Sequence, residues 1–61
     1  MSGMQKLGAE KRAKLEIEVR RMRMDATPIL HEYDRWRRNG MDSLTAYEWA
    51  MEMATNRKES R

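Results

Sequence analysis

The sequence predicts an all-α fold, either a small three-helix bundle or a helical hairpin with a long first helix, in an oligomer or bound to a partner. Three observations predict it. The first segment consists mostly of strong helix formers, helix boundaries stand at Thr27-Pro28 and Asn39-Gly40, and the last segment is apolar over much of its circumference. The expected single domain has helices near residues 9–26, 28–38 and 43–56, a flexible tail over 1–8 and a charged tail over 57–61.

The first helix is predicted by charge order and by apolar spacing. Glu10 with Lys14, and Glu16 with Arg20, place an acid four residues before a base, which supports a helix. Apolar residues recur at helical steps and form one stripe, made of Leu15, Val19, Met22 and Ala26.

Residues 14–24 also fit a strand. Apolar and polar residues alternate over 15–19 and again over Met22-Arg23-Met24, the pattern of a half-buried strand. A helix over these residues leaves Ile17 and Met24 opposite the main stripe. Composition and ion-pair order favour the helix, with the strand as the alternative.

The second helix has a clear start and a clear end. Pro28 disfavours a helical residue before it, and Thr27 has the hydroxyl of an N-cap, so we expect Thr27 as the cap and Pro28 at the first helical position. Asn39-Gly40 ends the helix, because glycine readily takes the left-handed conformation. One face of this helix is apolar and carries Ile29, Leu30, Tyr33 and Trp36.

The third helix, capped by Asp42 or Ser43, is apolar over an unusually wide arc. Its polar residues fall within roughly 80° of the helical wheel; they are Thr45, Glu48, Glu52 and Thr55. Its apolar residues fill roughly 220°; they are Leu44, Ala46, Tyr47, Trp49, Ala50, Met51, Met53 and Ala54. A surface helix usually has a narrower apolar stripe. We therefore expect this helix to be central, with neighbours on two sides.

Composition restricts how the chain can be stabilised. A chain of 61 residues buries only about 60% of the surface that its unfolded form exposes. It has no cysteine and one histidine, His31, so disulfides are excluded and we expect no metal and no cofactor. Helix packing or association remains. We find no basic-then-apolar leader and no long uncharged apolar run, and so expect a cytoplasmic protein with no membrane partner.

Catalysis is not expected. The sequence has no glycine-rich phosphate loop and no activated nucleophile, and neighbouring polar residues such as His31 and Glu32 point in different directions on a helix. We therefore expect neither an enzyme nor a small-molecule substrate. The net charge of +3 resides in residues 1–26, which favours an anionic partner for that segment.

The residue types point to protein binding. Trp, Tyr, Met and Arg are enriched at interfaces, although aromatic residues at helical spacing also form ordinary cores. We expect an adaptor, inhibitor or assembly factor that docks an apolar face with an arginine rim onto a partner protein or a second copy. Its anchors are Trp36, Trp49 and Met53, and its rim is Arg37 and Arg38.

The strand alternative carries a second hypothesis. With a strand over residues 19–25, the order strand, helix, Asn-Gly turn, helix resembles the ribbon-helix-helix transcription factors, in which two chains pair strands and insert them into the DNA major groove. The spacing from Met22-Arg23-Met24 to Gly40 and on to Ala50 is similar. The resemblance implies that Met22 and Met24 face inward and that Arg21 and Arg23 read bases. The alternative function is thus a DNA-binding dimer that uses Arg20, Arg21 and Arg23. Ion pairs with nearby acids are the ordinary explanation of this cluster.

Overall fold

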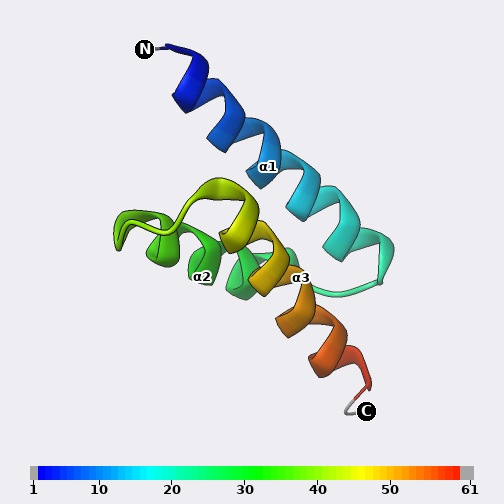
Figure 1. Cartoon of the computed structure of the whole chain (residues 1–61). Coiled ribbons are helices and arrows are strands. Elements are labelled where there is room, and N and C mark those ends of the chain that lie inside the picture. Colours follow the sequence, from blue (N-terminus) through cyan, green and yellow to red (C-terminus); the bar gives the residue numbers. More distant parts are fainter. Residues whose placement is uncertain (1, 60–61) are drawn as a thin grey trace.

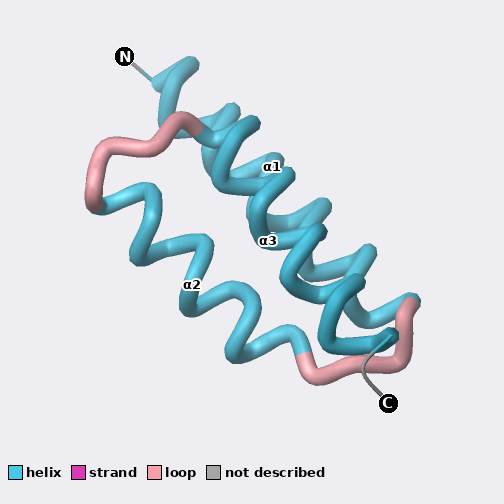
Figure 2. The backbone as a smooth tube through the Cα atoms, turned by 60° about the horizontal axis from the view of Figure 1, so that its bottom comes forward, coloured by secondary structure: helices cyan, strands magenta, loops and turns pink. Residues whose placement is uncertain are grey.

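A computed structural model describes residues 2–59, with side chains from residue 9 onward. Three helices make up the fold, α1 (Ser2–Arg21), α2 (Ala26–Arg38) and α3 (Ser43–Glu59) (Figure 1). All three contact one another. α1 and α3 lie side by side and run in the same direction, while α2 runs in the opposite direction (Figures 1 and 2). The all-α, three-helix prediction is confirmed. None of the described helices is long and apolar enough to cross a membrane.

The strand alternative is wrong. Residues 14–21 are helical, residues 22–25 form the connection to α2, and no strand occurs between residues 2 and 59. The paired ribbon of the ribbon-helix-helix arrangement is therefore not formed. α1 begins at Ser2, within the segment expected to be a flexible tail, and ends before the expected limit at Ala26. Met1 lies outside the described residues.

α1 ends in a Schellman turn that contains no glycine. The N–H of Met24 donates to the carbonyl oxygen of Val19 (3.4 Å), and the N–H of Arg23 donates to that of Arg20 (2.9 Å). Arg23 takes the left-handed conformation, with φ 61°. This turn moves Met24 off the helix, where it packs against the core, whereas Ile17 on the outer face is exposed as predicted.

α2 begins two residues earlier than predicted. Asp25 is the N-cap, and its carboxylate accepts a hydrogen bond from the N–H of Thr27 (3.0 Å). The assignment of Thr27 as the cap is therefore wrong. Pro28 lies within the first turn, where its missing N–H costs no intrahelical hydrogen bond. At the other end, the prediction for Asn39-Gly40 is confirmed, because Gly40 has φ 98°.

α3 begins after Asp42, one of the two predicted caps. The Asp42 carboxylate accepts from the N–H of Thr45 (3.1 Å) and from its hydroxyl (2.7 Å). The helix continues to Glu59, into the expected tail. Ser60 and Arg61 lie outside the described residues.

The core lies along the shared axis of the three helices. It contains Leu15, Val19, Ala26, Ile29, Leu30, Tyr33, Ala46, Ala50 and Ala54. α3 contributes to it only a row of alanines, each fully buried, and such small side chains let neighbouring helices approach closely. The predicted apolar face of α2 is confirmed, with Trp36 partly buried at the edge. The face predicted for the first helix is confirmed for Leu15 and Val19, whereas Met22 packs against the core from the connection and Ala26 from the start of α2.

Polar contacts join the helices at the surface. Arg12 of α1 pairs with both carboxylate oxygens of Asp34 in α2, Nε–Oδ1 and Nη2–Oδ2 each being 3.0 Å. Lys11 and Lys14 of α1 lie over the ring of Tyr47 in α3, 5.6 and 5.7 Å from its centroid. These contacts fix α1 against its two neighbours.

Candidate docking site

The apolar arc of α3 is wider than the bundle covers. Its middle is the buried alanine row, and Tyr47 is partly buried beneath the lysines of α1. The two edges of the arc remain open, since Leu44 is 49% exposed and Trp49 is 54% exposed. A large apolar side chain therefore reaches solvent on each flank of α3.

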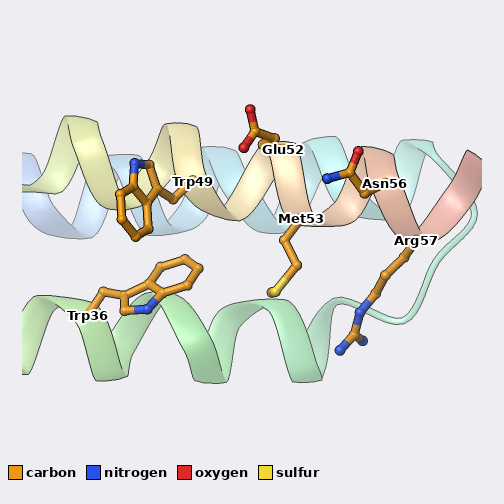
Figure 3. A pocket seen from close by; sticks show the side chains of 6 residues that line it. All are labelled: Trp36, Trp49, Glu52, Met53, Asn56 and Arg57. Atoms are coloured by element: carbon orange, nitrogen blue, oxygen red, sulfur yellow. The ribbon is translucent and has the colours of Figure 1, made fainter.

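The Trp49 edge adjoins a groove between α2 and α3, which we call the tryptophan groove. It has a volume of about 350 Å³. Figure 3 shows Met53 and Arg57 pointing from α3 toward α2, while Glu52 and Asn56 lie along the edge of α3 that is farther from α2. The six residues that line the groove are Trp36, Trp49, Glu52, Met53, Asn56 and Arg57.

The three predicted anchors meet in this groove. The ring centroids of Trp36 and Trp49 are 5.7 Å apart at an interplanar angle of 81°, an edge-to-face contact. Met53 is partly buried next to them. The structure thus brings Trp36, Trp49 and Met53 together, two of them from one helix and one from the other.

The structure does not place the predicted arginine rim at the groove. Nη1 of Arg37 donates to the carbonyl oxygen of Met41 (2.8 Å), which fastens the connection between α2 and α3. Burial raises the pKa of Tyr33, and the nearby charge of Arg37 opposes that rise. Arg38 is exposed in a different hollow, beside His31 and Arg35. Neither arginine lines the tryptophan groove.

Arg57 supplies the cation at the groove instead. Arg57 was predicted to lie in the charged tail over 57–61, and its place in the groove was not predicted. The sequence does contain a pattern that indicates Arg57. Trp49, Met53 and Arg57 are spaced four residues apart and therefore lie in one row along α3. Had the helix been extended past Asn56, this spacing would have indicated Arg57.

A second groove, which we call the methionine groove, lies at the end of the bundle where α1 turns into α2. It has a volume of about 670 Å³. Its lining consists of Met22, Arg23, Met24, Asp25, Pro28, Arg57 and Lys58. Arg57 lines both grooves, so the two adjoin at that side chain. None of these residues was predicted to share a pocket with α3.

The described cations differ in whether they have a carboxylate partner. Arg20 pairs with Glu16 (2.7 Å) and Arg21 with Glu18 (3.5 Å), as the ordinary explanation of that cluster expects. Arg12 pairs with Asp34 and Arg35 with Glu32. By contrast, the side chains of Arg23, Arg38, Arg57 and Lys58 make no ion pair or hydrogen bond with the residues that the structure describes. Three of them, Arg23, Arg57 and Lys58, line the methionine groove, and Arg38 lies in the hollow beside His31.

The three arginines of the DNA-binding alternative therefore do not form one surface. Arg20 and Arg21 are neutralised locally by glutamates of α1. Arg23 belongs to the methionine groove. No strand holds the three in a row for insertion into a DNA groove, at least over residues 2–59.

The described side chains include no cluster of three His, Cys, Asp or Glu residues that could hold a metal ion. Comparison of the chain with family models, with curated proteins and with solved structures finds no match. The functional interpretation therefore depends on the chemistry of the two grooves.

Proposed function

We propose that this chain is a non-enzymatic protein-interaction module, an adaptor, inhibitor or assembly factor that docks the tryptophan groove onto a partner protein. The observation that carries the proposal is Trp49, which is 54% exposed while it stands against the partly buried Trp36. An indole held in place by one neighbour and open to solvent on its other side can bind with little loss of side-chain freedom.

The exposed area of Trp49 is large enough for a binding anchor. Trp buries 150–250 Å² when fully covered, so covering the open half of Trp49 removes roughly 100 Å² from water. At about 25 cal/mol per Å² this burial contributes about 2.5 kcal/mol before the costs of association are subtracted. That value lies in the range of an interface hot spot, and hot spots are enriched in tryptophan and arginine.

The composition of the groove also supports a protein partner. Met53 is a flexible, polarizable side chain that adapts to different apolar surfaces. Glu52, Asn56 and Arg57 of α3 place polar groups beside the apolar residues. An apolar centre within a polar rim is the usual organisation of a protein interface.

A peptide selection tests the proposal. A library of randomised amphipathic helical peptides, displayed on phage, would be selected on the purified chain, and the best peptides would be titrated against variants. We expect enriched peptides to share large apolar residues, and Trp49→Ala to weaken their binding at least tenfold.

Leu44→Ala is the matched control, because Leu44 is the other half-exposed apolar residue of α3 and lies outside both grooves. We expect it to change the affinity less than twofold. Absence of any enriched peptide, or equal losses for Trp49→Ala and Leu44→Ala, would contradict the proposal.

A further inference from the structure

We infer that the partner segment is acidic at one end: its apolar anchor fills the tryptophan groove, and its carboxylates meet Arg23, Arg57 and Lys58 at the methionine groove. This inference rests on the proposed function and names the chemistry of the partner. It depends on the way that Arg57 joins the two grooves.

The distribution of positive charge favours an acidic partner. Four arginines in the bundle have a carboxylate of their own. Arg23, Arg57 and Lys58, none of which pairs with a described carboxylate, converge on one groove from two different segments, the α1–α2 connection and the last turn of α3. Like charges gathered in this way repel one another, and an anionic partner relieves that repulsion.

Among the described residues that line the methionine groove, Asp25 is the only carboxylate, and it already accepts a hydrogen bond. Asp25 caps α2 through the N–H of Thr27 (3.0 Å), and this hydrogen bond, with further help from the Thr27 hydroxyl, lowers the pKa of Asp25. The Asp25 carboxylate therefore stabilises the start of α2. The cations of the groove remain available to carboxylates from outside.

The lining of the methionine groove favours a protein over a nucleic acid. Met22, Met24 and Pro28 are apolar and offer no aromatic face on which a base could stack. Glu52 lies on the adjoining groove and would repel a phosphate backbone that extended past the cations. An acidic peptide with apolar side chains could contact both the methionine side chains and the cations of the groove.

The geometry sets the spacing within the partner. Trp49 and Arg57 are separated by two helical turns of α3, a rise of about 12 Å. A helical partner that lies along α3 would place its carboxylates about seven or eight residues from its main apolar anchor. Acidic residues are most favourable in the first turn of a helix, so we expect that helix to run antiparallel to α3.

The same peptide library, read for charge, tests this inference. We expect the selected sequences to be enriched in Asp and Glu two helical turns before the apolar anchor. The best peptide would then be titrated against the double variant Arg57→Gln/Lys58→Gln. Its affinity should fall at least tenfold, and the wild-type affinity should itself weaken as salt rises.

Arg35→Gln/Arg38→Gln is the matched control, because it also removes two cations from the last turn of a helix but lies outside both grooves. It should change the affinity less than twofold. Circular dichroism melting of the two double variants verifies that each folds, and Arg23→Gln gives an independent test from the other side of the groove.

The outcomes separate this inference from the proposed function. Apolar peptides that are selected without an acidic bias, and that bind the two double variants equally, would overturn the inference while the docking function stands. Loss of all selection would overturn both. Binding of a DNA or RNA oligonucleotide that Arg57→Gln/Lys58→Gln abolishes would assign the cations to phosphates. A dimer in light scattering that the same variant dissociates would make the occupant a second copy. Each of the last two results would contradict an acidic partner.

Discussion

The indole of Trp49 meets that of Trp36 edge to face, with ring centroids 5.7 Å apart and an interplanar angle of 81°. This contact joins α3 to α2, yet it leaves Trp49 54% exposed. An edge-to-face pair contributes about 0.5–1.5 kcal/mol beyond the area it buries. The contact is therefore strong enough to orient the Trp49 ring but leaves an open apolar surface next to the tryptophan groove.

Removal of Trp49 should damage stability much less than removal of a core aromatic residue. We expect Trp49→Ala to lower the free energy of unfolding by about 1–2 kcal/mol, since it loses the ring contact and partial burial. Tyr33 is 2% exposed, and Tyr33→Ala should cost about 3–5 kcal/mol. Urea denaturation followed by circular dichroism measures the two values.

A total stability of about 3–5 kcal/mol is usual for a domain of this size, so Tyr33→Ala should leave the chain largely unfolded. Trp49→Ala should keep most of its helix content. If Trp49→Ala is as damaging as Tyr33→Ala, Trp49 is an ordinary core residue and the site assignment is wrong.

The alanine row of α3 should tolerate no larger side chain. Ala50 is fully buried at the centre of that row, on a helix that contacts both α1 and α2, so Ala50→Leu should destabilise the bundle by about 1–3 kcal/mol through overpacking. Ala13→Leu, on an exposed part of α1, is the control and should be close to neutral. Thermal melts of the two variants compare them directly. Equal melting temperatures would indicate that the helices are not closely packed at Ala50.

Two left-handed positions predict opposite effects of glycine. Arg23 has φ 61° and Gly40 has φ 98°. Left-handed backbone costs a residue with a Cβ about 1 kcal/mol relative to glycine. Arg23→Gly should therefore stabilise the fold by up to about 1 kcal/mol, and Gly40→Ala should destabilise it by a similar amount.

The Gly40 effect should be purely conformational, because a Cβ at that position would meet nothing within 4 Å. Chemical denaturation of the two variants and the wild type measures whether each substitution raises or lowers the free energy of unfolding. Destabilisation by Arg23→Gly would show that the turn after α1 does not adopt the left-handed conformation in solution.

The N-caps should make the fold sensitive to acid. Hydrogen bonds from Thr27 lower the pKa of Asp25, and hydrogen bonds from Thr45 lower that of Asp42, each relative to the ordinary value of 3.8. A carboxylate whose pKa is lower in the folded state stabilises the fold above its unfolded pKa and loses that contribution as pH falls. Stability should therefore decrease as the pH falls below about 4.

Asp25→Asn/Asp42→Asn is the informative variant for this prediction, because asparagine still accepts the capping hydrogen bonds but carries no proton to titrate. Its melting temperature should depend less on pH between 5 and 2, values chosen to bracket the ordinary aspartate pKa. A pH profile that is identical to that of the wild type would assign the acid sensitivity to other carboxylates.

The sequence predicted most of the fold because its local signals agreed with tertiary packing. The apolar faces of α2, the Gly40 stop and the Asp42 cap all follow from short-range rules that the bundle does not override. The end of α1 does not follow from these short-range rules, because its last turn closes on Arg23 in a left-handed conformation that normally requires glycine. The start of α2 was misplaced because Pro28 is compatible with more than one position in a first helical turn.

The candidate site was predicted in part. Trp36, Trp49 and Met53 converge because each lies at an edge of an apolar face, which periodicity reveals. Arg37 turns back to the Met41 carbonyl and Arg38 faces another direction, since neighbours in a helix point about 100° apart. The methionine groove joins segments that are distant in sequence, and periodicity within one helix gives no information on such a contact.

The central claim is that folding leaves Trp49 open and that binding covers it. The most direct measurement is acrylamide quenching of tryptophan fluorescence in Trp36→Phe, where Trp49 is the only indole and an aromatic edge contact is retained. At concentrations at which light scattering shows a monomer, we predict efficient quenching of the free protein. Added selected peptide should reduce the quenching and shift the emission to shorter wavelength. Equal protection of Trp49 in the free monomer and in the peptide-bound protein would contradict the account.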